Sequence, residues 1–167
     1  MKEFLKEFGK DIVLLVVLLL VVSFFIKPII VEGVSMLPTL ESKDYLIVSK
    51  QSYNFGEPER GDIVVFPHDE GIDEKLYVKR VIGLPEDHIV IEDGNVYINN
   101  KKLNEDYIAE NYTSGDIDLV IPKGRIFVMG DNRGNSSDSR FFGTVKIDEV
   151  LGEAVVRLFP FSKIRLF

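Results

Sequence analysis

Two residues that could act together as a nucleophile and a base lie in apolar segments of the chain. Ser35 lies in the segment GVSMLP (33–38), and Lys79 lies in the strand-like run LYVKRVIG (76–83). A serine hydroxyl becomes a nucleophile when a neighbouring base removes its proton. Tyr77 and Val81 share the face of Lys79 by the two-residue period of a strand, and burial among them would lower the pKa of the amine. The two residues therefore fit hydrolysis by a Ser–Lys pair.

Both residues also have an ordinary interpretation. A serine beside glycine is usually a turn residue, and a lysine on a strand usually faces solvent and protects a sheet edge. The segment is not the nucleophile elbow of the hydrolase fold, because residue 37 is leucine instead of glycine. It is not a Ser-x-x-Lys motif either, since residue 38 is proline. Neither histidine, His68 or His88, lies in an apolar strand that could hold a base.

A third segment is dense in short side chains that form hydrogen bonds. It reads GDNRGNSSDSR (130–140), follows the apolar run RIFVM and precedes FFGTV. A polar surface loop would have the same composition. However, apolar runs on both sides should fix the two ends of this loop to a sheet.

The element that must hold Ser35 is the apolar segment before it. Residues 12–26 contain no charge and one polar residue, Ser23. Extended over 12–31, with Lys27 and Pro28 interrupting, the segment would be about 30 Å long as a helix, which spans a bilayer core. The segment therefore predicts a transmembrane anchor.

Two alternatives to an anchor fit less well. A buried core helix would need a polar face, and residues 12–26 have none. A cleaved signal peptide would need small residues after the apolar run, but KPIIVEGVSM contains no alanine. Lys2, Lys6 and Lys10 precede the segment and favour a cytoplasmic N-terminus.

The element that must hold Lys79 is one of many short apolar runs beyond residue 40, which turn signals separate. Asp93-Gly94-Asn95 is a strong hairpin signal, and Asn99-Asn100 is another turn by composition. We expect loops over 68–75 and 104–118, and one helical turn over 147–152. Short strands without β-α-β spacing predict a mainly β, antiparallel domain that is barrel-like or folded over on itself. The strand-like runs are 44–50, 61–66, 76–83, 88–92, 95–99, 125–130 and 153–159.

Composition excludes several classes of site. The chain has no cysteine, so a disulfide framework, a cysteine nucleophile and a thiolate metal site are all ruled out. A metal site would need both histidines, and each stands in a polar, turn-like setting. The net charge of −7 repels phosphate backbones, which argues against nucleic-acid binding.

Together these segments resemble the type I signal peptidases across essentially the whole chain, in the short form known from Gram-positive bacteria. The matching pieces are the anchor followed by SMLPTL (35–40), GDIVVF (61–66), YVKRVIGLP (77–85) and GDNRGNSSDSRFFG (130–143). The resemblance implies a membrane-bound serine endopeptidase that removes N-terminal signal peptides from exported preproteins. Its partners would be signal peptides and the lipid bilayer. No metal, nucleotide or organic cofactor would be required.

The resemblance also implies a role for individual residues. Ser35 would be the nucleophile and Lys79 the general base. Ser136 would form a hydrogen bond with the lysine amine and orient it, and Asp138 and Arg140 would form a supporting ion pair. Asp131 and Arg133 look like residues that hold the loop. Shallow pockets for small side chains of the substrate would be lined by Val31, Met36 and Val78.

The implied organisation is a cytoplasmic tail (1–11), a transmembrane anchor (12–31) and an extracytoplasmic catalytic β domain (32–167). The sequence departs from the family's pattern at Gly33, where some relatives have a hydroxyl that helps to form the oxyanion hole, and at Glu86, where many have glycine.

Two other functions remain open. A self-cleaving repressor would need a DNA-binding domain and a cleavage site of its own, and a tethered β domain that only binds a partner would fit the composition equally well.

Overall fold

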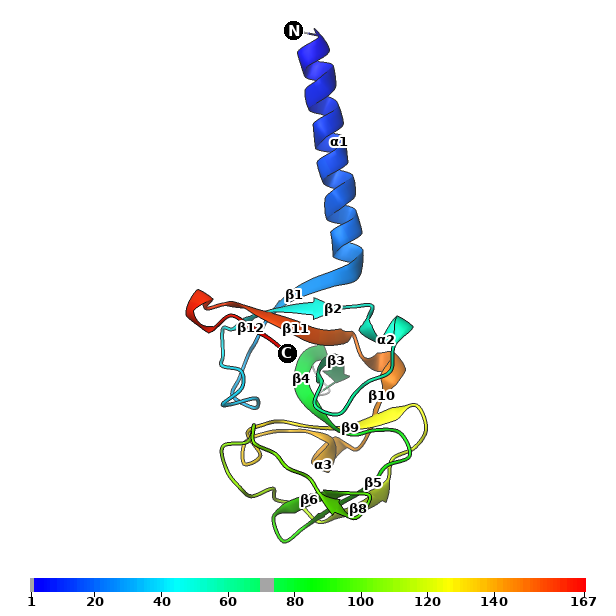
Figure 1. The fold of residues 1–167 in the computed structure, drawn as a ribbon, viewed down its shortest axis with the longest axis vertical. Coiled ribbons are helices and arrows are strands. Elements are labelled where there is room, and N and C mark those ends of the chain that lie inside the picture. The colour runs from blue at the N-terminus through cyan, green and yellow to red at the C-terminus, as the bar shows by residue number, and fades with distance from the viewer. Residues whose placement is uncertain (1, 70–73) are drawn as a thin grey trace.

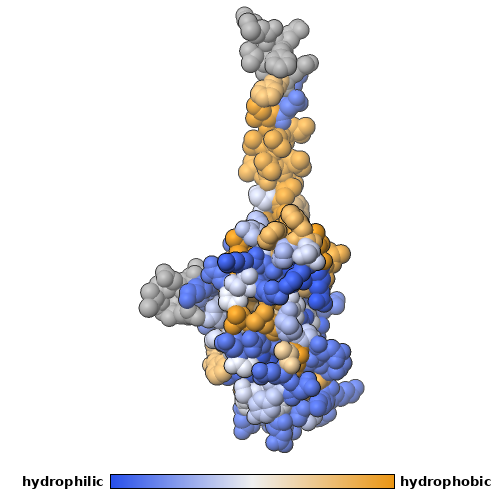
Figure 2. Space-filling model, turned by 90° about the vertical axis from the view of Figure 1, so that its left-hand side faces the viewer, coloured by the Kyte–Doolittle hydropathy of each residue, from blue (hydrophilic) through white to orange (hydrophobic). Residues whose placement is uncertain are grey.

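The structure, a computed structural model, describes residues 2–69 and 74–167 and has one long helix above a β domain (Figure 1). Helix α1 covers Lys2–Phe25. Its segment Phe8–Phe25 has a mean hydropathy of 2.5 and none of it is buried. By length and composition, this helix could cross a membrane. Figure 2 shows its hydrophobic surface rising from a mostly hydrophilic domain.

The end of α1 differs from the anchor that we expected at residues 12–31. The helix ends at Phe25, and strand β1 (Ile26–Ile30) follows directly. Pro28 lacks a backbone N–H and disfavours helical geometry in the residue before it, so the helix cannot continue through this segment. Strand β1 is at the edge of a sheet, where proline is tolerated. The β domain therefore begins at residue 26 instead of 32, and most of the expected tail 1–11 is helical.

The larger sheet contains eight strands, and all its pairings are antiparallel. Their order is β1-β2-β11-β3-β4-β9-β10, and β12 pairs with β11. The additional strands are β2 (Tyr45–Ser49), β3 (Ile63–Asp69), β4 (Glu74–Gly83), β9 (Arg125–Met129), β10 (Val145–Lys146), β11 (Gly152–Phe159) and β12 (Arg165–Leu166).

The smaller sheet has four antiparallel strands in the order β7-β6-β5-β8 and lies at the end of the domain away from α1 (Figure 1). The predicted hairpin and the predicted turn both occur in it, because Asp93-Gly94 joins β5 to β6 and Asn99-Asn100 joins β6 to β7. All four turn residues have positive φ angles, as a type I′ turn requires. The strands are β5 (His88–Glu92), β6 (Asn95–Ile98), β7 (Lys101–Lys102) and β8 (Ile117–Val120).

The loop predictions were only partly right. The first predicted loop covered 68–75, but strand β3 includes 68 and 69, and strand β4 includes 74 and 75. Its remaining part, 70–73, lies outside the described residues. The second predicted loop ends at 116, because β8 begins at Ile117. The helical turn expected within 147–152 is a 3-10 turn. The short helices are α2 (Ser52–Phe55), α3 (Ser139–Phe142), η1 (Ile147–Glu149) and η2 (Phe161–Lys163).

The mainly β, antiparallel fold is as predicted, and its core has three apolar clusters. One lies between the smaller sheet and strands β4 and β9, and a second surrounds Val64 and Phe66 of β3. The third supports the segment that contains Ser35. Its buried members are Val31, Met36, Leu40, Leu46, Ile63 and Ala154. Since burial of apolar area is the main stabilising term in folding, this third cluster fixes the backbone on both sides of the serine.

Candidate active site

The fold brings Ser35 and Lys79 into contact. Ser35 lies in the turn that follows β1, and Lys79 lies in the middle of β4. Lys79 Nζ is 2.7 Å from Ser35 Oγ, which is hydrogen-bonding distance. Only 4% of the lysine is exposed to solvent. A base and a hydroxyl from segments 44 residues apart therefore meet in a place that largely excludes water.

Burial lowers the pKa of Lys79 from 10.5 to about 8, because the ammonium form loses its hydration. The carboxylates of Asp138 and Asp131 act in the opposite direction and raise the pKa by a smaller amount. The ring centroid of Tyr77 is 4.9 Å from Lys79 Nζ, on the same face of β4, and Val81 on that face is fully buried. Near neutral pH this lysine is thus neutral in a substantial fraction of molecules.

The 130–140 loop is held rigidly by its own side chains. Asp138 is fully buried and accepts hydrogen bonds from the Gly130 N–H (3.1 Å) and from Arg140 Nε and Nη2 (2.8 and 2.9 Å). The Ser139 hydroxyl accepts a hydrogen bond from the Val128 N–H on β9 (2.9 Å). The Asp138–Arg140 ion pair is therefore present, and it fixes the loop to the end of β9.

Ser136 does not form the hydrogen bond that we expected. Its Oγ atom is buried and has no hydrogen-bond partner among the described residues. It lies against Gly130, where an added Cβ would be 2.3 Å from Ser136 Oγ and 2.4 Å from the carbonyl oxygen of Ser35. Ser136 is thus near the Ser35 backbone, and its role toward Lys79 stays a prediction.

A buried ion pair that the sequence did not indicate joins the three segments. Arg80 Nε and Nη2 donate to the two carboxylate oxygens of Asp131 at 2.8 and 2.7 Å. The Thr39 hydroxyl donates to the same carboxylate at 2.5 Å. Thr39 comes from the serine segment, Arg80 follows Lys79 on β4, and Asp131 belongs to the 130–140 loop. Bidentate pairing with arginine is strong and directional, so it sets how the three segments meet.

Arg133 holds the loop from its other side. It is buried and forms an ion pair with Glu105, donates to the Thr113 hydroxyl at 2.6 Å, and donates to the Gly130 carbonyl at 3.0 Å. Both Glu105 and Thr113 belong to the polar segment before β8. That segment is therefore part of the support of the site, which its composition alone did not reveal.

A cleft of about 940 Å³ lies beside the pair, between β1 with the residues after it and the first half of β4. In the described part of the chain, β1 pairs only with β2, and β9 pairs with β4 only from Arg80 onward. Among the described residues, no second strand pairs with β1 or with the Val78–Lys79 part of β4 on the side of the cleft. The predicted pocket residues Val31, Met36 and Val78 line it together with Ser35 and Lys79. Volume alone does not locate the site, since a cavity of about 980 Å³ near α2 and β10 contains neither residue of the pair.

Gly33 has a φ angle of +86°, and no atom lies within 4 Å of the position that a Cβ would take. This left-handed conformation is easy for glycine and strained for other residues. A serine or threonine at this position would therefore need a different backbone. The Ser35 N–H donates no hydrogen bond within the described ranges, so it is available to a ligand.

Most of the chain is similar to proteins of one known family. Residues 5–159 match the family described as signal peptidase, peptidase S26. The chain is 43% identical to signal peptidase I of Bacillus licheniformis, an alignment that covers 98% of this chain and 94% of that protein. It is 41% identical to signal peptidase I T of Bacillus subtilis, with 95% and 88% covered. A crystal structure of a signal peptidase I from Enterococcus faecalis matches with a TM-score of 0.51 and 39% identity, and the match covers 58% of this chain and 96% of that one. The chain therefore belongs to the signal peptidase family, peptidase S26, and is an enzyme of the signal peptidase I type.

Proposed function

We propose that this protein is a membrane-bound serine endopeptidase that uses Ser35 and Lys79 to cleave N-terminal signal peptides from exported preproteins. The observation that supports the pair most directly is the 2.7 Å distance between Lys79 Nζ and Ser35 Oγ at a lysine that is only 4% exposed. A lysine with a pKa of about 8 is neutral in about a fifth of molecules at pH 7.4, against about one in a thousand for an ordinary lysine.

In the first half of the reaction, the neutral Lys79 amine takes the proton of the Ser35 hydroxyl. The serine oxygen forms a bond to the scissile carbonyl carbon, and the π electrons of the carbonyl move onto its oxygen. Collapse of this tetrahedral species breaks the C–N bond, and the Lys79 ammonium gives its proton to the departing amine. The mature protein leaves, and the signal peptide stays attached to Ser35 as an ester.

In the second half, Lys79 is neutral again and removes a proton from a water molecule that attacks the ester. The signal peptide then leaves with a new carboxylate, and Ser35 regains its proton from Lys79. Every proton moves between substrate, water and this one pair, so the proposed reaction uses no metal or organic cofactor.

The substrate is expected to bind as an extended strand in the cleft. The edges of β1 and of Val78–Lys79 in β4, which no second described strand pairs on the cleft side, offer main-chain hydrogen bonds to an extended peptide. Val31 and Met36 are almost fully buried, and Val78 packs against the same cluster, so these residues leave only shallow apolar depressions. Such pockets would accept small side chains, typically alanine, at the first and third residues before the cut.

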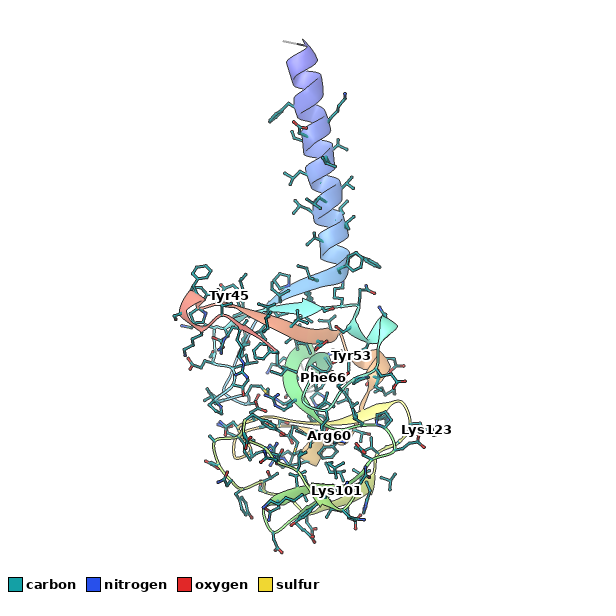
Figure 3. The ribbon with its side chains drawn as sticks, viewed as in Figure 1. Tyr45, Tyr53, Arg60, Phe66, Lys101 and Lys123 are labelled. Atoms are coloured by element: carbon teal, nitrogen blue, oxygen red, sulfur yellow. The ribbon has the colours of Figure 1, made fainter. Side chains whose placement is uncertain are left out.

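The bilayer is proposed as the second partner. Helix α1 has the length and hydropathy of a membrane span, and β1, β2 and β11 lie at its foot (Figure 1). Tyr45 is at this end of the domain, whereas Lys101 is at the opposite end (Figure 3). The same end carries an apolar surface, made of the exposed residues Ile30, Tyr45, Leu158, Phe159, Phe161, Ile164 and Leu166. An anchored enzyme would meet its membrane-bound substrate at a high effective concentration.

The orientation is proposed from the lysines before the span. With Lys2, Lys6 and Lys10 on the cytoplasmic side, the β domain would be on the extracytoplasmic side, where exported preproteins emerge.

The decisive experiment is cleavage of one preprotein by the purified full-length enzyme in lipid vesicles. Ser35→Ala should remain folded and membrane-bound but release no signal peptide. Ser42→Ala, at an exposed serine in the following loop, is the matched control and should cleave normally. Normal processing by Ser35→Ala would reject the proposed nucleophile, and no processing by the wild type would favour a binding module.

A further inference from the structure

The backbone on both sides of Ser35 is held by one residue of the 130–140 loop. The Asn132 backbone N–H donates to the Ser35 carbonyl at 3.0 Å. Its side-chain Nδ2 donates to the Val34 carbonyl at 3.1 Å, across 98 residues of sequence. Asn132 thus binds the carbonyls of the two peptide units that meet at the Cα atom of the serine.

The Asn132 side chain contacts the Val34–Ser35 peptide unit, which also contains the Ser35 N–H. In a trans peptide the C=O and N–H bonds point in opposite directions. The Ser35 N–H therefore points away from Asn132, and no described residue accepts a hydrogen bond from it. The Val34 carbonyl also accepts a hydrogen bond from the Leu37 N–H at 3.2 Å, so this peptide plane is fixed by two donors.

Close packing at Gly130 indicates that this contact is built into the loop. A Cβ atom on Gly130 would be only 2.4 Å from the Ser35 carbonyl oxygen, so any other residue would push the loop away from the serine. The missing side chain lets the loop approach closely enough for both Asn132 hydrogen bonds. Gly33, in turn, provides no hydroxyl near the same peptide unit.

We infer that Asn132 is a positioning residue for the oxyanion hole: its side-chain amide orients and polarises the Val34–Ser35 peptide unit, whose N–H binds the developing oxyanion. This inference rests on the proposed function, with Ser35 as nucleophile. When Ser35 Oγ bonds to the substrate carbonyl carbon and its proton moves to Lys79 Nζ, the carbonyl π pair becomes a negative charge on oxygen. A donor that is fixed in advance and polarised through its own carbonyl stabilises that charge more than a mobile one.

A purely structural role for Asn132 makes different predictions. If the side chain only filled space, the isosteric Asn132→Asp would be milder than Asn132→Ala. If its N–H donor matters, Asn132→Asp should be at least as damaging, because an ionised carboxylate donates nothing to the Val34 carbonyl and repels it. The backbone N–H bond to Ser35 survives in both variants.

The experiment compares Asn132→Ala and Asn132→Asp with the same changes at Asn95. Asn95 is also half-buried, and its Nδ2 also donates to a backbone carbonyl, that of Asp93 at 3.0 Å, but it lies in the smaller sheet. Full-length enzymes in vesicles are assayed for kcat and KM on one preprotein. They are also assayed for inhibition by a peptide aldehyde with alanine at its last position, which forms a tetrahedral adduct with a serine nucleophile.

We expect Asn132→Ala to lower kcat by about 5- to 10-fold, because one neutral hydrogen bond is removed while the oxyanion donor itself remains. Loss of a direct donor would instead cost about 10²- to 10³-fold. KM and the pH at which kcat/KM reaches half its plateau should stay unchanged for Asn132→Ala. The affinity for the aldehyde should fall by the same factor as kcat, and both Asn95 variants should behave as the wild type.

Several results would overturn the inference. These are an unchanged kcat in Asn132→Ala, an Asn132→Asp variant closer to wild type than Asn132→Ala, a loss that appears in KM alone, or unfolding of both variants. Failure of the proposed function is distinguishable, since it would appear as residual cleavage by Ser35→Ala or as an aldehyde that does not inhibit the wild type.

Discussion

Raising the pH from 6.5 to 9 should increase kcat/KM for preprotein cleavage about 30-fold and bring it to a plateau. In the proposed mechanism the reactive form has a neutral Lys79, and burial lowers the pKa of this amine to about 8. Its neutral fraction then rises from about 3% at pH 6.5 to about 90% at pH 9. Below pH 8 the rate should change about tenfold for each pH unit, as expected for a single ionisation.

The plateau separates this mechanism from its alternatives. With an ordinary lysine pKa of 10.5, kcat/KM would rise about 300-fold over the same interval and would still be rising at pH 10. A histidine base would give a limb near pH 6.5 that is flat by pH 8. The pH at which kcat/KM reaches its plateau therefore distinguishes a buried lysine from an ordinary lysine and from a histidine.

The assay measures kcat/KM from pH 6 to 10 on one preprotein, with full-length enzyme in vesicles. Lys79→Arg should be inactive at every pH, since guanidinium keeps its charge and cannot accept the serine proton. His68→Ala and His88→Ala should keep the limb of the wild type. Activity in Lys79→Arg, or a limb that disappears with either histidine, would replace the Ser–Lys mechanism with a Ser–His one.

The same pKa has a consequence for stability. A folded-state pKa of about 8 is below the unfolded value of 10.5, so between these values the unfolded chain binds more protons. The free energy of unfolding should therefore increase as pH rises from 8 to 10.5, and below pH 8 the buried ammonium costs up to about 3 kcal/mol. Lys79→Met should be more stable than wild type at pH 7 and lose this advantage by pH 10. An advantage independent of pH would mean that the pKa of the amine is the same in the folded and the unfolded chain, so that burial does not lower it.

Further predictions concern the neighbouring hydroxyl and the membrane. Ser136→Ala should lower kcat sharply, because its hydroxyl is predicted to orient the Lys79 amine, and should change the melting temperature little, because the buried Oγ atom has no partner among the described residues; an unchanged rate would remove it from the site. Protease added outside intact protoplasts should degrade the β domain, and protection of that domain would reverse the proposed orientation. The chain has no tryptophan, so Phe161→Trp and Phe141→Trp give single fluorophores at two sites that are both 73% exposed. Brominated lipids should quench the first, in η2 at the α1 end of the domain, and leave the second, on α3, unquenched. Equal quenching would argue against a membrane-facing end of the sheet.

Local sequence patterns predicted the strands and turns because their causes are local. Alternation of apolar residues and the φ preferences of Asp93-Gly94 and Asn99-Asn100 act within a few residues. The end of α1 was missed because the apolar composition continues through β1 to Val31, although Pro28 already marked the change. The strand at Ile117–Val120 was missed because its environment is set by pairing with β5. Polar composition there resembled that of a loop.

Sequence patterns could indicate Ser35 and Lys79, but they could not indicate the ion pair that joins the three segments. Ser35 and Lys79 each have an ordinary interpretation alone, and they could be named as a pair because three segments together resemble the signal peptidase family. The ion pair of Arg80 with Asp131, and its contact with Thr39, could not be derived in this way. Each of these residues is an ordinary polar residue in its own segment, and only the crossing of three distant segments makes them partners.

The arrangement of charges around Lys79 explains how one buried site can contain both a neutral amine and two carboxylates. An unpaired carboxylate near the lysine would favour its ammonium form and remove the base. Asp138 is bound by Arg140, and Asp131 is bound by Arg80, through two nitrogen atoms of the guanidinium in each case. Burial is the largest effect on Lys79 and outweighs the attraction of the two carboxylates, each of which is paired with an arginine, so the pKa of Lys79 stays low. The two ion pairs thus fix the segments that meet at Ser35, while the pKa of the Lys79 amine stays well below 10.5.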